Sequence, residues 1–299
     1  MISIKDYDAN YHIDPKTVRK LKNMSGILTN KLSSVPIFFV KRETIDRHCR
    51  GICLSTECTD DLFNSGEFDR YHQDFFEKEI RNIRIRDFGY VFPNEENVNR
   101  LFEKLKGCVM MCDAIGCYIS NSDEIYEKPH ILTCPEKINY SGKRQFEAIL
   151  LEVILHELTH AFFSSEDNQE LTNHIVEESL CDAYAISRFR SKEYLFEFMS
   201  DHLRPPEYRS YVFWIEISKS IPLVYFMHRW KTKNYFEFSY FLVTKIHYDI
   251  MDMEIKGGYS ILRNSKLVEH YKYFRDKMMS TQNYSVVLQI VALMLLSFS

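Results

Sequence analysis

Residues 141–163, with the sequence SGKRQFEAILLEVILHELTHAFF, decide the fold class that we expect for this chain. Ser141 is of a residue type that caps helices, and apolar side chains then recur at three- and four-residue intervals. These apolar positions are Phe146, Ile149, Leu150, Val153, Ile154, Leu158 and Ala161. The pattern predicts one helix that ends near Phe163.

The second half of this helix carries the motif His156-Glu157-Leu158-Thr159-His160. Helical geometry stacks His156 and His160 on one face, so both imidazoles can reach the same ion at about 2.0–2.1 Å. Glu157 is turned by about 100° and faces the water that such an ion binds. Zinc lowers the pKa of that water, and the carboxylate accepts its proton. The motif predicts one Zn²⁺ per chain, with Glu157 as the general base that hydrolyses a peptide bond.

A catalytic zinc site needs a third protein ligand and one position that is left for water. After a polar break at residues 164–169, we expect a second helix over residues 171–189. It places Glu178 and Asp182 four residues apart, and therefore on one face. We expect Glu178 to complete the zinc site while Asp182 accepts a hydrogen bond from a ligand imidazole.

Two other side chains stay open as the third ligand. His174 lies 14 residues after the last histidine of the motif. Glu177 neighbours Glu178 but has no Asp four residues later. The metzincin pattern is absent, because Phe163 and Glu166 stand where its Gly and His would be.

Both segments carry a family resemblance, which covers about residues 130–190. The motif followed by Glu178 resembles the HEXXH…E pattern of gluzincin metallopeptidases. Residues 178–185, ESLCDAYA, are also similar to the E-x-x-A-N-x-F-A signature of ImmA/IrrE-type peptidases. Here Cys181 replaces the Ala of that signature, and Asp182 replaces its Asn.

The resemblance implies a role for each residue of the two segments. The zinc ligands would be His156, His160 and Glu178. Glu157 would be the general base, and Asp182 would orient the first histidine.

Short strands precede the motif helix. Residues 35–40 are typical of a buried strand, and residues 116–120 and 130–134 of a strand pair joined by a turn. Only 9 Gly and 8 Pro interrupt the chain, which favours helices elsewhere, including one after Asp14-Pro15. We expect the α+β class: a helix-rich, zincin-like fold with a small mixed β-sheet before the active-site helix and a helical C-terminal half.

The expected elements divide the chain into three regions. They are a mixed α/β region at residues 1–110, a zincin-like catalytic core at 111–205 and a helical region at 206–299. Before the strand pair we expect helices over about 67–85 and 94–105. After residue 189 we expect helices over 192–203, about 207–230, 234–251, 264–279 and 285–297.

The resemblance also implies two substrate contacts. In such peptidases an edge strand before the active helix binds an extended substrate through main-chain pairing. That place is held by Ile131, Leu132 and Thr133, with a purely structural strand as the alternative. A downstream Tyr or His is expected to stabilise the oxyanion. Tyr211 is the candidate, and the alternatives are Tyr208, His202 and His228.

The net charge of −4 and the pI near 6.3 do not indicate a nucleic-acid binder. No apolar run approaches the roughly 20 residues of a membrane span. The nearest, Val286 to Phe298, reads either as a buried C-terminal helix or as a docking tail. The first residues lack the apolar region of a secretory signal, so we expect a cytoplasmic protein whose eight cysteines are reduced.

The cysteines contain one repeated spacing. Cys49, Cys53 and Cys58 are spaced like Cys108, Cys112 and Cys117, which suits either a second metal site or buried thiols. Three functions therefore compete. They are a zinc peptidase acting on a protein or peptide, a non-catalytic zinc-stabilised scaffold that binds a protein partner, and a regulatory module built on the cysteine triplets.

Overall fold

A computed structural model describes the parts of the chain that bear the predicted motif. The described residues are 2–48, 51–52, 109–110, 114–138, 142–163, 171–189, 211, 214–215, 218, 222–233, 238 and 291. The chain divides into two compact units. The first comprises residues 1–53, 109–169 and 180–204, and the second comprises 54–108, 170–179 and 205–299.

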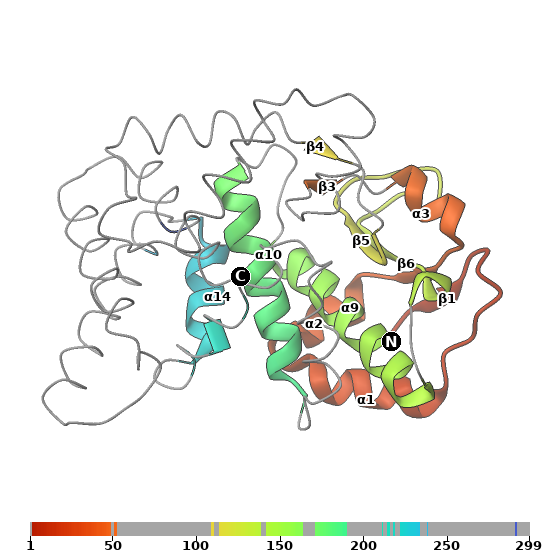
Figure 1. Ribbon diagram of the computed structural model, residues 1–299, viewed down its shortest axis with the longest axis horizontal. Helices are drawn as coiled ribbons and strands as arrows, with labels where there is room; N and C mark the ends of the chain where they lie inside the picture. Colours follow the sequence, from red (N-terminus) through yellow and green to blue (C-terminus); the bar gives the residue numbers. More distant parts are fainter. Residues whose placement is uncertain are drawn as a thin grey trace, which may run out of the picture. The chain divides into compact units, whose positions relative to one another are not determined.

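The first unit contains a four-stranded mixed sheet (Figure 1). Its order is β1 (Ile4–Asp6), β2 (Ile37–Phe39), β6 (His130–Thr133) and β5 (Gly116–Ile119). The first three strands are parallel, and β5 runs antiparallel to β6. The predicted strand pair and the mixed α+β class are thus confirmed. A separate antiparallel pair joins β3 (Gly51–Ile52) to β4 (Val109–Met110).

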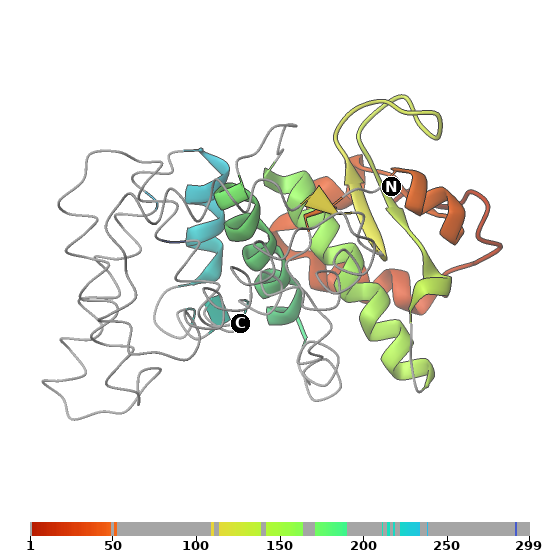
Figure 2. The same cartoon turned by 45° about the horizontal axis from the view of Figure 1, so that its top comes forward.

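Side chains alternate between the two faces of the sheet, and along the central strands β2 and β6 both faces are buried. Cys117 and Ile119 of β5 pack against an apolar cluster on one face. That cluster consists of Phe38, Val40, Ile45, Leu132 and Cys134. Helix α9 (Lys143–Phe163) lies along β5 and β6 on the other face, as the light green helix of Figure 2 shows.

Three of the predicted helices, those after Asp14-Pro15, over 141–163 and over 171–189, form with slightly shifted ends. Helix α1 (Pro15–Ser25) starts at Asp14, whose Oδ1 accepts a hydrogen bond from the Lys16 amide at 2.7 Å. Helix α9 is apolar around most of its circumference, and its second half is buried except for the partly exposed His160, as expected of a core helix. Helix α10 (Leu171–Ser187) follows it.

The end of α10 is fastened to the turn after α1. The Tyr184 hydroxyl donates to the Ser25 carbonyl at 2.7 Å and accepts from the Ile27 amide at 3.2 Å. Gly26 between them has a φ of +53°, a region that glycine adopts without strain. Burial raises the pKa of Tyr184, so the hydroxyl stays protonated as a donor.

The predicted helix over about 207–230 is wrong as a single element. Pro222 is extended, with φ −53° and ψ 128°, and α14 (Leu223–Lys231) begins directly after it. Proline has no amide hydrogen and disfavours helical geometry in the residue before it. Tyr211 before this break is helical.

The compact units differ from the three predicted regions. Strands β1 and β2 share a sheet with β5 and β6, so a division near residue 110 would cut through one hydrogen-bonded layer. The helices predicted over 67–85, 94–105, 192–203, 234–251, 264–279 and 285–297 fall almost entirely outside the described residues. Among the helices that are described, none is long and apolar enough to cross a membrane.

Candidate metal centre

Helix α9 brings the two motif histidines together in the first unit. The Nε2 atoms of His156 and His160 lie 3.1 Å apart, and the ring centroids lie 4.8 Å apart. Two nitrogens bound to one tetrahedral zinc ion at their usual bond lengths lie about 3.3 Å apart. The pair is therefore spaced as a two-nitrogen donor set for one ion.

Asp182 sets which nitrogen of His156 can bind a metal. Its Oδ1 lies 2.7 Å from His156 Nδ1, and the carboxylate is fully buried. Because a carboxylate accepts, Nδ1 carries the proton, which leaves the lone pair on Nε2. That lone pair is on the nitrogen that faces His160. Such a contact fixes the tautomer and raises the basicity of a ligand imidazole.

A second buried carboxylate, which the sequence reasoning missed, belongs to Glu152. It is 1% exposed and lies one helical turn before His156. A carboxylate oxygen of Glu152, one of Asp182 and a ring nitrogen of His156 all lie within 4.8 Å of one another. The signal was present, because this Glu interrupts an otherwise apolar run, residues 148–155.

Cys181 was also missed as a metal-ligating side chain. Its Sγ and one ring nitrogen each of His156 and His160 all lie within 4.8 Å of one another. The side chain is fully buried. Cys181 stands three residues after Glu178, so helical spacing placed it on the face that bears the predicted ligand.

Strand β5 passes directly over the predicted general base. A Cβ atom on Gly116 would lie 3.0 Å from Glu157 Oε1 and 2.5 Å from Val153 Cγ1. No side chain fits there, and Gly116 allows the strand to approach α9 this closely. The Glu157 carboxylate, 7% exposed, is thus held between α9 and the main chain of β5.

Tyr118 shares this face of β5 with Gly116, two residues earlier. Burial raises the pKa of Tyr118, and a positive charge on His160 partly offsets the rise. The phenol therefore lies within electrostatic reach of the motif and is protonated at neutral pH. The sequence reasoning sought such a hydroxyl only downstream of α9 and overlooked this upstream one.

The predicted substrate contacts of β6 are wrong. This strand pairs with β2 on one edge and β5 on the other, so its main chain has no open edge for a substrate. Its side chains, including Ile131, Leu132 and Thr133, are buried. Within the described sheet, the edge position on this side belongs to β5.

The remaining predicted residues lie in the second unit. Glu178 is buried on α10, one turn before Asp182, and its role as third ligand stays a prediction. Glu177, the alternative ligand, accepts a hydrogen bond from Trp230 Nε1 at 3.0 Å and so has a structural partner. Tyr211 is buried, and its role in stabilising an oxyanion stays a prediction.

Other candidates are placed only in part. His174 lies in the first turn of α10, and His228 belongs to α14. Tyr208 and His202 lie outside the described residues, as do all cysteines of the two triplets except Cys117. Cys117 packs against the apolar cluster of the sheet.

The donor atoms fit zinc, which prefers imidazole nitrogen, thiolate sulfur and carboxylate oxygen. The buried Asp182 contact adds the outer partner that a ligating histidine requires. No protein-family model matches this chain, and neither a curated protein nor a solved structure does.

Proposed function

We propose that this chain is a zinc-dependent peptidase of zincin-like fold in which Glu157 is the general base. The observation that carries the proposal is the convergence of His156 Nε2 and His160 Nε2 to 3.1 Å, with Asp182 on the opposite nitrogen of His156. A pair of surface histidines at this spacing would not need a buried carboxylate such as Asp182 to hold one ring, so the contact supports a metal-binding role.

The proposed third ligand is Glu178. Asp182 reaches His156 from α10, and Glu178 precedes Asp182 by one turn of the same helix. Residues four apart share a helix face, which supports a role for both in one centre. The predicted Glu177 alternative is less favourable, because its carboxylate is engaged by Trp230.

In the proposed reaction, the residues of this chain bind the peptide and move the proton. Bound zinc would supply Lewis acidity for the scissile carbonyl. Glu157 takes a proton from the attacking water and passes it to the leaving amine. Its position between α9 and β5 limits the orientations of the carboxylate, which favours proton transfer at one place.

The substrate is proposed to add to β5, because β5 is the sheet edge that crosses Glu157. Main-chain hydrogen bonds along Gly116–Ile119 would hold a peptide extended beside the motif. Tyr118 is a second candidate donor to the oxyanion, beside Tyr211, since its protonated phenol shares the face of β5 that bears Gly116.

The test compares Glu157→Gln with wild type in zinc content and in cleavage of a mixed peptide library. We expect about one zinc per chain in both proteins and a loss of cleavage of about 10²-fold or more in the variant. Glu147→Gln is the matched control, because Glu147 lies on the same helix but pairs with Lys20 at the surface. Full cleavage by Glu157→Gln would overturn the mechanism.

A non-catalytic zinc-stabilised scaffold is the second candidate. The observation that favours it is the fully buried thiol of Cys181 beside both histidines, because four protein ligands are typical of structural zinc sites. Wild-type protein that retains zinc but cleaves no peptide of the library would support this function instead.

A further inference from the structure

We propose that Cys181 binds the metal directly, as a thiolate beside His156 and His160. The inference rests on the metal centre of the proposed function but does not require peptide cleavage. It assigns a sulfur ligand to a centre for which the sequence predicted only nitrogen and oxygen ligands. Cys181 in place of Glu178 would leave one position for water, whereas both together would give the four protein ligands of a structural site.

The first argument is distance. The Cys181 Sγ and a ring nitrogen of each histidine lie within 4.8 Å of one another, and the two Nε2 atoms are already 3.1 Å apart. Sulfur and nitrogen bound to one tetrahedral zinc ion lie about 3.6 Å apart. A side-chain adjustment of about 1 Å therefore brings all three donors into one coordination sphere.

The second argument is the helix that presents the thiol. Cys181 directly precedes Asp182, whose carboxylate contacts His156 at 2.7 Å, so this turn of α10 lies against the motif. The Tyr184 hydroxyl, three residues after Cys181, fastens the same turn to Ser25 and Ile27. Both fastened residues follow Cys181 within one helical turn, and they fix the turn that carries the thiol beside the histidines.

The third argument is the contrast with the other described thiols. Cys134 belongs to the apolar cluster on the opposite face of the sheet, and Cys117 packs against that cluster. Burial raises the pKa of Cys134, which keeps that thiol protonated and apolar. Among the described cysteines, Cys181 is the one grouped with imidazole donors.

The chemistry of the step is simple. Cys181 loses its thiol proton to solvent when the sulfur–metal bond forms, so metal binding releases one proton from this residue. A thiolate shifts the preference of the centre toward soft ions such as zinc and cadmium, and away from magnesium and calcium.

The experiment uses the full chain loaded with Co²⁺ in place of zinc. A cobalt–thiolate bond gives a near-ultraviolet charge-transfer absorption that nitrogen and oxygen ligands do not give. We expect this absorption in wild type and in Cys134→Ala, a matched buried thiol, and its loss in Cys181→Ser and Cys181→Ala. Zinc affinity should fall by more than about tenfold in both Cys181 variants.

Wild-type protein that binds one Co²⁺ without this absorption overturns the inference, and this measurement needs no variant to fold. Absorption that persists in folded Cys181→Ser overturns it too, as does a chain that binds no Co²⁺. The peptidase proposal can fail independently. If the protein shows the absorption but cleaves no peptide, Cys181 remains a ligand and the peptidase proposal is overturned. If it cleaves peptides without the absorption, only the assignment of Cys181 is overturned.

Discussion

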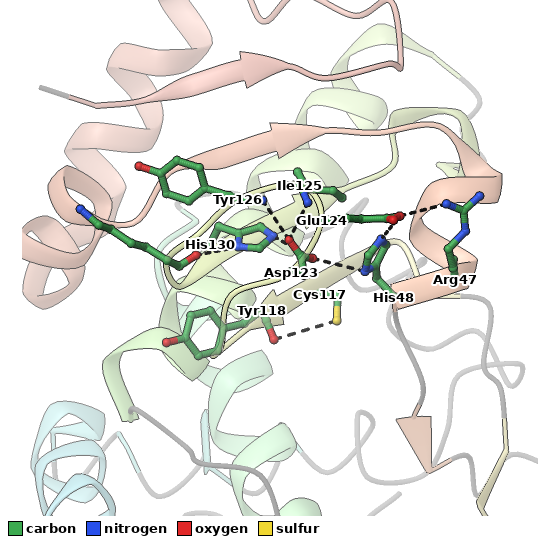
Figure 3. A network of polar contacts seen from close by, with 10 residues as sticks. Arg47, His48, Cys117, Tyr118, Asp123, Glu124, Ile125, Tyr126 and His130 are labelled. Carbon is green, nitrogen blue, oxygen red and sulfur yellow. Dashed lines mark hydrogen bonds and ion pairs between the residues drawn. The ribbon is translucent and has the colours of Figure 1, made fainter.

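Two clusters of histidine and carboxylate side chains, on opposite faces of one sheet, use the same residue types differently. The motif cluster joins His156 and His160 to Asp182. The second, which we call the histidine clamp, comprises His48, His130, Asp123 and Glu124 (Figure 3). The first leaves ring nitrogens facing each other, whereas in the clamp every ring nitrogen faces an oxygen.

Asp123 is the centre of the histidine clamp. Its Oδ2 lies 3.2 Å from His48 Nδ1 and 3.3 Å from His130 Nε2. Neither contact of Oδ2 meets the geometry of a hydrogen bond. Its Oδ1 accepts from the Ile125 and Tyr126 amides at 2.8 and 2.9 Å.

The remaining ring nitrogens of the clamp face oxygens as well. His130 Nδ1 lies 2.8 Å from the Lys128 carbonyl, and His48 Nε2 lies 3.3 Å from Glu124 Oε1. Carbonyl and carboxylate oxygens only accept, so the ring nitrogen is the donor wherever one of these contacts is a hydrogen bond. The clamp fastens α3 (Arg42–His48) to the connection between β5 and β6. Its two rings do not point their nitrogens toward one another, as the rings of His156 and His160 do. The orientation of the rings, rather than the residue types, separates the proposed metal centre from the histidine clamp.

The largest expected effect separates the two clusters by metal binding. His160→Ala should weaken zinc binding by more than about 100-fold, because removal of a ligand costs more than removal of its outer partner. His48→Ala, from the histidine clamp, should bind zinc like wild type. Isothermal titration of metal-free protein measures both, and equal zinc affinity in the two variants would contradict the comparison.

The next effect separates the clusters by stability. Asp123→Asn should lower the free energy of unfolding by about 1–3 kcal/mol, because an amide replaces the partly buried carboxylate that lies against both histidines. Zinc affinity of the folded variant should not change, since within the described part of the chain no clamp residue belongs to a group of possible metal ligands with the motif. Denaturant unfolding measures the stability of the variant, and a zinc titration of the folded protein measures its affinity. A weaker zinc affinity would show that the clamp contributes to metal binding.

A smaller effect concerns the carboxylate behind the motif. Asp182→Asn should weaken zinc binding by about 10–100-fold, because the amide no longer holds the Nδ1–H tautomer of His156 as firmly. Asp123→Asn serves as the matched carboxylate control from the other cluster. An unchanged zinc affinity in Asp182→Asn would show that the contact at 2.7 Å has no role in metal binding.

The smallest effect concerns the strand between the clusters. Gly116→Ala should cost about 1–3 kcal/mol of stability, because its Cβ would overlap Val153 and press on Glu157. Peptide cleavage should fall as the general base is displaced. Ile45→Val, in the apolar cluster on the opposite face, should cost about 1 kcal/mol and leave the cleavage rate unchanged. Equal cleavage rates in both variants would contradict the placement of β5 over Glu157.

Local patterns predicted much of the first unit. The period of residues 141–163 predicted α9, and alternation predicted β5 and β6 as a pair. The order of the strands could not be predicted from local patterns, because β2 pairs with β6 across more than ninety residues of sequence. This pairing also removes the open edge that the sequence interpretation assumed for β6. For the same reason the histidine clamp was missed, since His48 and Asp123 meet only once the sheet is formed.

Tyr184 ties the helix turn of the proposed metal centre to the first residues of the first unit. Its hydroxyl bonds Ser25 and Ile27, and the same helix turn carries Cys181 and Asp182. A fragment that starts near residue 111 would lack both partners of this hydroxyl, as well as two strands of the sheet. The smallest piece that can be expected to assemble the centre must include residues 1–53, so recombinant fragments should be cut elsewhere.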